Sequence, residues 1–478
     1  MNVPAQTPST DKVPLMEKLG FGIGELGNNL FWQFFMYFLL YFYTDIYKIA
    51  PGKSAAEVAG WMFAIVRFFD AFFDVTMGVI ADRTNTRWGK YRPYLLFGAL
   101  PFGLAGVLAF TTPHFGDTGK IVYAYITYTF LMMMYSLVAI PQNSLLGVLT
   151  PNTQERTVLS SYKFVFAFCA GAIVEFGTPF FVQLFGHGNE ARGYQMTLVG
   201  YAVVAVCFFV ICFLSIRERV SPPAHQKTNL KRDFGDLFTN IPWIVLSLTT
   251  LATIMAIAVR SATFIYYFKY YVKDQTVNTV LFGVRHFTYL QMLGVFLGLG
   301  PCFSIVGTIL VPFFTRLIGK KALYCVLIGG SGIATVAYYF IRPDQVGLIF
   351  LGQIFYSITL GPTSAVLWAM YADCADFSEW IHNRRATGLV YSAAIMAQKF
   401  GWTFGGWLPG IMLTYFGYIA DTDLSQHALH GILLMDSLIP ALCSFVAAGL
   451  VLFYSLTETR MQTIETDLKA RRAAAAAA

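Results

Sequence analysis

Residues 66–74 read VRFFDAFFD, so one basic and two acidic side chains interrupt a run rich in phenylalanine. They lie within a longer apolar segment, 57–82, which polar turns bound on both sides. A helix needs about 20 apolar residues to cross the hydrocarbon core of a bilayer. Ionisable groups inside such a helix are costly and usually functional. The segment therefore predicts a membrane-spanning helix whose charged residues serve transport or coupling.

The composition of the whole chain agrees with a membrane protein. Of 478 residues, 56% are hydrophobic, 17% are aromatic and 12% are charged, whereas soluble domains carry about 25% charged residues. This excludes an ordinary soluble enzyme and a disordered chain, and it argues against nucleic-acid binding. The seven cysteines form no CxxC pair, so we expect buried free thiols. The first sixteen residues are polar and predict no cleavable signal peptide.

Apolar runs between charged or Pro/Gly turns predict twelve helices. Their expected ranges are 19–47, 57–82, 93–113, 120–149, 158–186, 195–216, 242–272, 286–316, 322–341, 345–374, 386–417 and 427–457. The longest polar interruption, 217–241, separates six helices from six. We therefore expect an N-terminal six-helix bundle (1–216), a cytoplasmic middle loop (217–241), a C-terminal bundle (242–460) and a cytoplasmic tail (461–478).

Basic residues predict the orientation of these helices. With the N-terminus inside, 21 Lys and Arg fall on cytoplasmic segments and 7 on the opposite face. Cytoplasmic loops are enriched in Lys and Arg, so both termini are expected in the cytoplasm. The net charge of +7 thus reflects topology rather than an acidic partner.

Two loops indicate an internal repeat. Gly89 in the loop after the second helix corresponds to Gly319 after the eighth, and Arg156 after the fourth helix corresponds to Arg385 after the tenth. The two offsets are nearly equal, which predicts a duplicated six-helix unit with the substrate site between the halves. Chance similarity of basic loops is the alternative.

Asp70 and Asp74 are the predicted cation-coupling residues. They are four residues apart and so share one helix face. Two carboxylates persist there if a cation lies between them or if one is protonated. Arg67 lies on the same face, and a buried Arg67–Asp70 ion pair is the structural alternative.

A polar stripe on the first helix suits a sugar. Glu25, Asn28 and Trp32 combine hydrogen-bonding groups with an aromatic face, whereas helix–helix hydrogen bonding is the alternative. Further candidate substrate contacts are Asn29, Arg67, Gln142, Asn143, Lys163, Arg260, Lys399 and Trp402. Pro141 predicts a kink beside these groups, and Glu175 is interpreted as the partner of an ion pair.

Charged residues at the expected cytoplasmic ends predict a gate. Asp373 and Asp376 share a helix face and are expected to pair with Arg384, Arg385 or the basic loop after the second helix. The full predicted gate comprises Lys90, Arg92, Arg156, Asp373, Asp376, Glu379, Arg384 and Arg385. Ordinary interfacial charges are the alternative.

No enzyme signature is present: the chain lacks HExxH, GxSxG, a P-loop and a glycine-rich dinucleotide fingerprint. We therefore predict neither an enzyme nor a resident cofactor or metal, only a co-transported H⁺ or Na⁺.

Several motifs together resemble the glycoside–pentoside–hexuronide:cation symporters, the melibiose permease family of the major facilitator superfamily. They are 41–45 (YFYTD), 67–78, 87–93 (RWGKYRP), 266–270 (YYFKY) and 372–379. The resemblance covers nearly the whole chain. It implies cation ligation by Asp70 and Asp74 with the Ser136 hydroxyl, and sugar contacts that include Lys163 and Lys399. The stretch 81–101 looks closest to members thought to carry xylosides or similar glycosides.

The chain departs from the melibiose permease pattern at four places. Asn28 and Asn29 replace a Lys-Asp pair, Ala139 replaces an aspartate, Asn143 replaces a tryptophan and Lys163 replaces an arginine. Loss of the carboxylate at 139 argues against galactoside specificity and favours a proton or a weak Na⁺ site.

The sequence thus predicts an all-α membrane protein with twelve transmembrane helices in the major facilitator fold. We expect a monomeric, cation-coupled symporter of a sugar or glycoside in the bacterial inner membrane. Transport of a lipid-like amphiphile is one alternative, and a receptor with a transporter-like fold is another.

Overall fold

The structure is a computed structural model that describes residues 12–51, 54–150, 153–219, 239–279, 283–382 and 387–477. The chain divides into two compact units, Met1–His225 and Gln226–Ala478. The division falls within the polar segment 217–241 that was expected to separate the bundles. Each unit is described below by itself.

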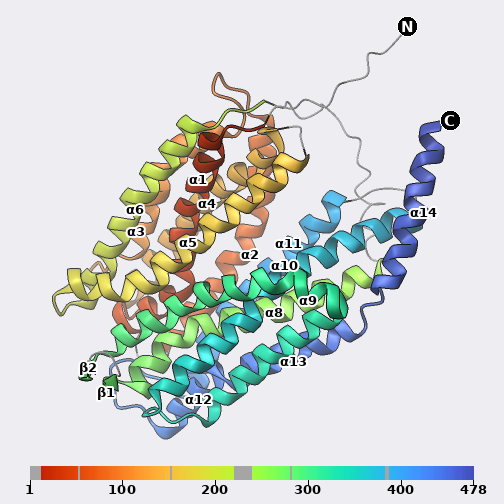
Figure 1. Cartoon of the computed structure of the whole chain (residues 1–478). Coiled ribbons are helices and arrows are strands. Elements are labelled where there is room, and N and C mark those ends of the chain that lie inside the picture. The colour runs from red at the N-terminus through yellow and green to blue at the C-terminus, as the bar shows by residue number, and fades with distance from the viewer. Residues whose placement is uncertain are drawn as a thin grey trace. The chain divides into compact units, whose positions relative to one another are not determined.

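Helices make up almost all of both units (Figure 1). The first unit contains α1 (Leu15–Tyr41), the π-helical turn η1 (Phe42–Ile46), α2 (Ser54–Arg83), α3 (Arg92–Ala109), α4 (Asp117–Val148), α5 (Thr153–Gly186) and α6 (Glu190–Ser215). The second contains α8 (Ile241–Tyr266), the π-helical turn η2 (Tyr267–Val272), β1 (Gln275–Thr279), β2 (Gly283–Phe287), α9 (Tyr289–Phe340), α10 (Val346–His382), α11 (Thr387–Tyr415), α12 (Gln426–Asp436), α13 (Leu438–Leu452) and α14 (Glu458–Ala477).

The prediction of twelve spanning helices is confirmed. Among the described residues, eight helical segments are long and apolar enough to cross a membrane. One of them, α9, is interrupted at Gly319 and supplies two spans. The helices α1, α2 and α11 complete the set, and they carry the polar candidates such as Glu25, Asp70 and Lys399.

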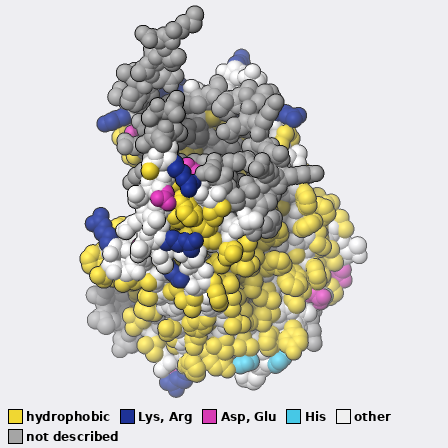
Figure 2. All heavy atoms as spheres, turned by 90° about the vertical axis from the view of Figure 1, so that its right-hand side faces the viewer, with side chains coloured by type: hydrophobic (Ala, Val, Ile, Leu, Met, Phe, Trp, Pro, Cys, Tyr) yellow, Lys and Arg dark blue, Asp and Glu magenta, His cyan; other side chains and the backbone are white. Residues whose placement is uncertain are grey.

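The surface has the apolar character that lipid requires. Large side chains such as Ile309, Leu317 and Phe340 are at least 70% exposed. Figure 2 shows a broad hydrophobic area on one face, with most charged side chains at its margins. Exposed apolar surface of this extent is unfavourable in water, so it indicates contact with the bilayer.

Two local predictions were wrong, and the secondary structure of the tail was not predicted. Residue 286 belongs to the antiparallel hairpin β1–β2 rather than to a helix, with Thr276 opposite His286. The final predicted span, 427–457, consists of α12 and α13, because the chain leaves helical geometry at Ser437. Pro440 contributes to this break, since it cannot donate to the carbonyl of Asp436. The tail after 457 is largely the polar helix α14.

The two units share local features that accord with a repeat. Helices α1 and α8 each continue into a π-helical turn, η1 or η2. Gly89 and Gly319 both have positive φ, at 108° and 78°. A Cβ atom at Gly89 would lie 2.5 Å from the Glu218 carboxylate, and one at Gly319 would lie 3.1 Å from Glu458. Glycine is therefore required at Gly89 for both conformation and space.

Glycines also bring helices close together. A Cβ at Gly20 or Gly24 of α1 would collide with Ser215 or Cys212 on α6. In the second unit, a Cβ at Gly405 of α11 would lie 2.3 Å from Ala258 of α8. Small residues at such spacing allow close packing of membrane helices.

Candidate functional site

Glu25 is the centre of a polar cluster formed by α1, α4 and α5. One of its oxygens accepts a hydrogen bond from Asn29 at 3.0 Å, and the other accepts from Gln142 at 3.3 Å. The Lys163 ammonium lies 3.9 Å from the Glu25 carboxylate and donates to Asn143. The cluster therefore combines one acid, one cation and three amides, which is a suitable set of partners for sugar hydroxyls.

One face of α1 is partly exposed along its length, whereas the rest of the helix is largely buried. The half-buried residues between positions 25 and 37 are Glu25, Asn29, Trp32, Gln33, Met36 and Tyr37. Their spacing of three and four residues is that of one helical face. Asn28 does not belong to this face, because it is 4% exposed and donates to Gln142 at 3.4 Å. Asn28 thus lies behind the cluster and orients Gln142.

Trp32 joins the Glu25 cluster to Arg67. The Arg67 guanidinium lies 4.7 Å from the centre of the Trp32 ring, and Trp32 lies 5.3 Å from the ring of Tyr135. Arg67 also donates to the Tyr128 hydroxyl at 3.3 Å. No ion pair within 4 Å links Arg67 to an acid among the described residues, so the Arg67–Asp70 pair considered above does not form.

Asp70 meets Ser136 across the α2–α4 contact. Its carboxylate accepts a hydrogen bond from the Ser136 hydroxyl at 2.9 Å, and both residues are buried. Asp74 lies one turn further along α2 and is partly buried. Two carboxylates and a hydroxyl supply the oxygen donors that Na⁺ or a proton would require.

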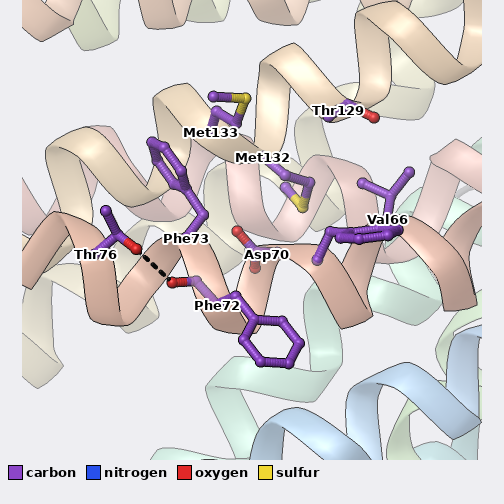
Figure 3. A pocket seen from close by; sticks show the side chains of 9 residues that line it. Val66, Asp70, Phe72, Phe73, Thr76, Thr129, Met132 and Met133 are labelled. Atoms are coloured by element: carbon purple, nitrogen blue, oxygen red, sulfur yellow. Dashed lines mark hydrogen bonds between the residues drawn. The ribbon is translucent and has the colours of Figure 1, made fainter.

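A cavity of about 300 Å³ opens beside Asp70. Figure 3 shows the Asp70 carboxylate among apolar side chains of α2 and α4, including Phe72, Phe73 and Met132. Thr76 and Thr129 add hydroxyl groups to its wall. Asp70 is therefore reached from a largely apolar cavity, in which a charged carboxylate favours a bound cation or proton.

Two of the predicted substrate residues in the second unit lie on α11. Lys399 and Trp402 are both half-buried and less than one turn apart. Close packing of α11 against α8 at Gly401 and Gly405 sets the rotation of this helix.

Arg260 has a different environment from the other predicted substrate residues. Its side chain is 1% exposed and lies 3.8 Å from the Asp436 carboxylate. The Arg260 Nε donates to the Asp436 backbone carbonyl at 3.2 Å, which replaces the donor that Pro440 lacks. The rings of Tyr338 and Tyr356 lie against the guanidinium. These contacts favour a structural role at the break between α12 and α13.

Two residues of the predicted gate make contacts within the first unit. Glu218 accepts hydrogen bonds from the backbone N–H groups of Lys90, Tyr91 and Arg92 at 2.8–3.0 Å. The Arg92 guanidinium donates to the Phe213 carbonyl at 2.6 Å. Both contacts fix the loop before α3 to the end of α6.

The remaining gate candidates belong to α5, α10 and the segment after α10. Asp373 pairs with Lys320, which follows the break in α9, rather than with the predicted arginines. Asp376 and Glu379 lie on the same end of α10 and are half-buried. The Arg156 side chain, Arg384 and Arg385 lie outside the described residues.

Two acids at the ends of α1 and α5 form ion pairs that were not predicted. Glu17 forms a two-pronged ion pair with Arg219 at 2.6 and 2.7 Å. Glu155 pairs with Lys18 at 2.8 Å, and this hydrogen bond lowers the pKa of the Glu155 carboxyl. Charged residues at helix ends are too common for sequence alone to indicate such pairings.

Comparison with known proteins identifies the class. The MFS/sugar transport protein family matches residues 20–458. The chain therefore belongs to this family, and its resemblance to the glycoside–pentoside–hexuronide:cation symporters is confirmed.

The similarity to individual relatives extends over nearly the full length of this chain and of each relative. The inner membrane symporter YicJ of Escherichia coli is 32% identical, with 96% of each chain covered. The isoprimeverose transporter of Lactiplantibacillus pentosus is 30% identical and covers 98% of this chain and 94% of its own. A solved structure of a D-xylose–proton symporter has a TM-score of 0.61 at 14% identity, covering 92% of this chain and 97% of its own. This structural similarity supports the major facilitator fold.

Proposed function

We propose that this protein is a secondary active transporter that couples import of a sugar or glycoside to entry of H⁺ or Na⁺. A β-glycoside or xyloside is the proposed substrate class. The observation that carries the proposal is the Glu25 cluster, where acid, cation and amide groups meet on the partly exposed face of α1 beside Trp32. Polar groups with an aromatic face are the partners that a sugar ring requires.

The Asp70, Asp74 and Ser136 groups are the proposed coupling site. Asp70 and Ser136 lie within hydrogen-bond distance of one another, and Asp74 lies one turn away. With Ala139 in place of a third carboxylate, these two acids favour a proton or a weakly held Na⁺. Cation loading reduces the local negative charge, which lowers the cost of moving the site through the membrane.

Transport by alternating access is the proposed mechanism, with sugar contacts from Glu25, Asn29, Trp32, Arg67, Gln142, Asn143 and Lys163, joined by Lys399 and Trp402. Substrate and cation shift the equilibrium only if they bind the two conformations differently. Lys90, Arg92, Asp373, Asp376 and Glu379 are proposed gate residues, together with Arg156, Arg384 and Arg385. The 21-to-7 distribution of basic residues supports cytoplasmic termini in an inner membrane.

Uptake into proteoliposomes tests the proposal. Labelled isoprimeverose, methyl β-xyloside and methyl β-glucoside would be supplied with an imposed proton gradient, a sodium gradient or neither. We expect at least one glycoside to accumulate above its external concentration under one gradient. Uptake that equilibrates equally under all three conditions would show that the protein is not a cation symporter.

Amphiphile transport is a second candidate function. The observation that favours it is the cavity beside Asp70, whose wall includes Val66, Phe69, Phe73 and Met133. Competition distinguishes the two functions. Inhibition of glycoside uptake by methyl β-xyloside but not by a lysolipid supports sugar transport, and the reverse supports the amphiphile.

A further inference from the structure

The hairpin strand β2 forms one wall of a cavity within the second unit. The cavity has a volume of about 490 Å³, and its other walls come from α9 and α10, close to where these two helices begin. This volume is within the range of about 300–1,000 Å³ that is typical of small-molecule sites. None of the described residues that line the cavity belongs to the proposed sugar, cation or gate sites.

The cavity lies where two helices enter the bilayer. The apolar spans of α9 and α10 begin at Tyr289 and Val346, and Val346 itself lines the cavity. The other end of α10 contacts the polar tail helix, since Trp380 donates to Asp467 of α14. Figure 1 shows the hairpin at the end of the second unit opposite α14. An occupant of the cavity is therefore placed at the depth of the lipid headgroups on that side.

Most of the cavity wall is apolar. Phe287 of β2, Met292 of α9 and Phe350 of α10 all contribute to it. Met292 is 4% exposed, whereas Val295, which lies less than one turn further along α9 and also lines the cavity, is 45% exposed. Part of the wall thus belongs to the apolar surface that contacts lipid, and it suits an acyl chain.

The polar part of the wall supplies hydrogen-bond donors and one positive charge. The Gln291 carbonyl oxygen accepts from the Thr288 N–H at 3.2 Å, so its NH₂ group is the part that can donate to an occupant. The Nδ1 atom of His286 contacts the Thr276 hydroxyl at 3.3 Å. Among the described residues of the wall, Arg285 carries the one permanent charge, and none is an acid. This set favours an anion over a cation.

The acids nearest in sequence have partners of their own. Asp274 accepts from the Tyr289 N–H at 2.8 Å, and Asp344 pairs with Arg342 at 3.4 Å. Arg285 is also one of only seven basic residues on the face expected outside the cytoplasm, against 21 on the other face. Because Lys and Arg are depleted on that face, topology does not account for a basic residue beside this cavity.

We propose that this cavity binds an anionic phospholipid. Its phosphate contacts Arg285 and Gln291, and its acyl chain lies along Val295 and Phe350. Hydrogen bonds between a guanidinium and a phosphate are strong because both partners are charged. A free phosphate would leave the apolar wall uncovered, and a neutral sugar would leave Arg285 without an anion. The site is separate from the proposed sugar and cation sites, and it does not depend on the proposed symport.

Site-specific photolabelling tests the proposal. The full-length protein is placed in phosphatidylcholine nanodiscs that contain a small fraction of phosphatidylglycerol with a photoreactive acyl chain. Peptide mass spectrometry then measures labelling of residues 285–295 and 346–350. We expect phosphatidylglycerol to label these residues about tenfold or more above phosphatidylcholine that carries the same reactive chain. Equal labelling by the two lipids would overturn the proposal.

Two arginine variants test the headgroup contact. Arg285→Gln removes the charge, and we expect it to reduce phosphatidylglycerol labelling here about tenfold, to the level of phosphatidylcholine. Labelling elsewhere in the chain should not change, which shows that the variant is folded. Arg342→Gln is the matched control, because Arg342 pairs with Asp344 and does not line the cavity. Undiminished labelling in Arg285→Gln would contradict the assigned contact.

A glycine variant tests the cavity itself. Gly347 lines the cavity, and a Cβ atom added there meets no atom within 4 Å. Gly347→Leu should therefore fold normally and block the acyl chain. Gly329→Leu is its control, since Gly329 of α9 has equally open surroundings but does not line the cavity. Equal labelling in Gly347→Leu and Gly329→Leu would overturn the proposal. Loss of labelling on addition of glycerol phosphate would identify a site for a free anion instead of a lipid.

Discussion

At the scale of single residues, the chemistry of this protein depends on acids that have specific partners. Glu25 is surrounded by amides and Lys163, whereas Asp70 has a serine hydroxyl and an apolar cavity. The first environment suits a neutral polar ligand, and the second suits a cation or proton. These differences assign distinct proposed roles to two carboxylates of one unit.

Substitution of Asp70 tests the coupling role. We expect Asp70→Asn to lower gradient-driven accumulation by about tenfold or more while leaving exchange measurable. The amide keeps an oxygen that accepts from Ser136 but cannot bind a cation as strongly. Uptake with and without gradients measures the effect, and Ser136→Ala provides the matched variant of its partner. Full active transport by Asp70→Asn would show that the residue is structural.

Lys163 allows a test of the sugar site. Loss of charged hydrogen bonds costs about 1.5–3 kcal/mol, so we expect Lys163→Met to raise the substrate KM by roughly 10- to 100-fold. Lys163→Arg keeps the charge and should remain within a few-fold of wild type. Initial uptake rates over a range of substrate concentrations measure both variants. Equal KM values for Lys163→Met and wild type would place the sugar elsewhere.

At the scale of elements, two helix N-termini are held by carboxylates, Glu218 after α6 and Glu458 after α13. Glu218 accepts from three backbone N–H groups before α3, and Glu458 accepts from the Lys320 N–H at 2.7 Å. Anionic groups are stabilising at the N-termini of helices because unpaired N–H groups gather there. Each contact fixes one of the two loops that correspond in the predicted repeat.

Glu218 accepts three backbone hydrogen bonds and Glu458 accepts one, so we expect their substitutions to differ in their effect on stability. Glu218→Gln should reduce the free energy of unfolding by about 1–3 kcal/mol, because the negative charge among three N–H groups is lost. Glu458→Gln should cost less, since it affects a single backbone bond. Thermal unfolding of both variants in detergent measures the difference. Equal losses of stability would contradict this explanation.

Gly89 provides a separate test of the same loop. Gly89→Ala forces a Cβ into the space of the Glu218 carboxylate and retains an unfavourable positive φ. We expect a loss of about 1–3 kcal/mol. Gly188→Ala also has a positive φ, but it has no atom within 4 Å of the added Cβ. A larger loss for Gly89→Ala than for Gly188→Ala, measured by thermal unfolding, would isolate the contact with Glu218.

At the scale of the whole molecule, the polar helix α14 belongs to the core of the second unit. Met461, Ile464 and Leu468 are at most 4% exposed and pack with residues of α10. The Trp380 indole donates to Asp467 at 3.0 Å, which joins α14 to the same end of α10 as Asp373. The tail is therefore part of the folded unit.

Truncation after Thr457 tests the role of α14. Burial of the three apolar side chains contributes roughly 4–9 kcal/mol as an upper estimate, so we expect a marked fall in the unfolding temperature of the truncated protein. Removal of only the alanines 473–478 is the matched control and should have little effect. Thermal unfolding and retention of monodisperse protein measure both. An unchanged unfolding temperature after removal of 458–478 would contradict the assignment.

The sequence by itself determined the number of spanning helices, their approximate limits and the residues that bear charge within them. Apolar length and helical periodicity are local properties, so they remain visible in an unfolded chain. Apolar length and periodicity also indicated functional roles for Glu25, Asp70 and Lys399, because isolated charges inside apolar helices are energetically costly.

Only the tertiary structure decided which side chains meet. Asn28 lies behind Glu25 rather than beside it, and Asp373 pairs with Lys320 rather than with the predicted arginines. Each choice depends on the rotation of one packed helix against another, and glycine contacts and proline breaks set that rotation. Periodicity places a residue on a helix face, but the partner opposite that face depends on the packing of segments far apart in the chain.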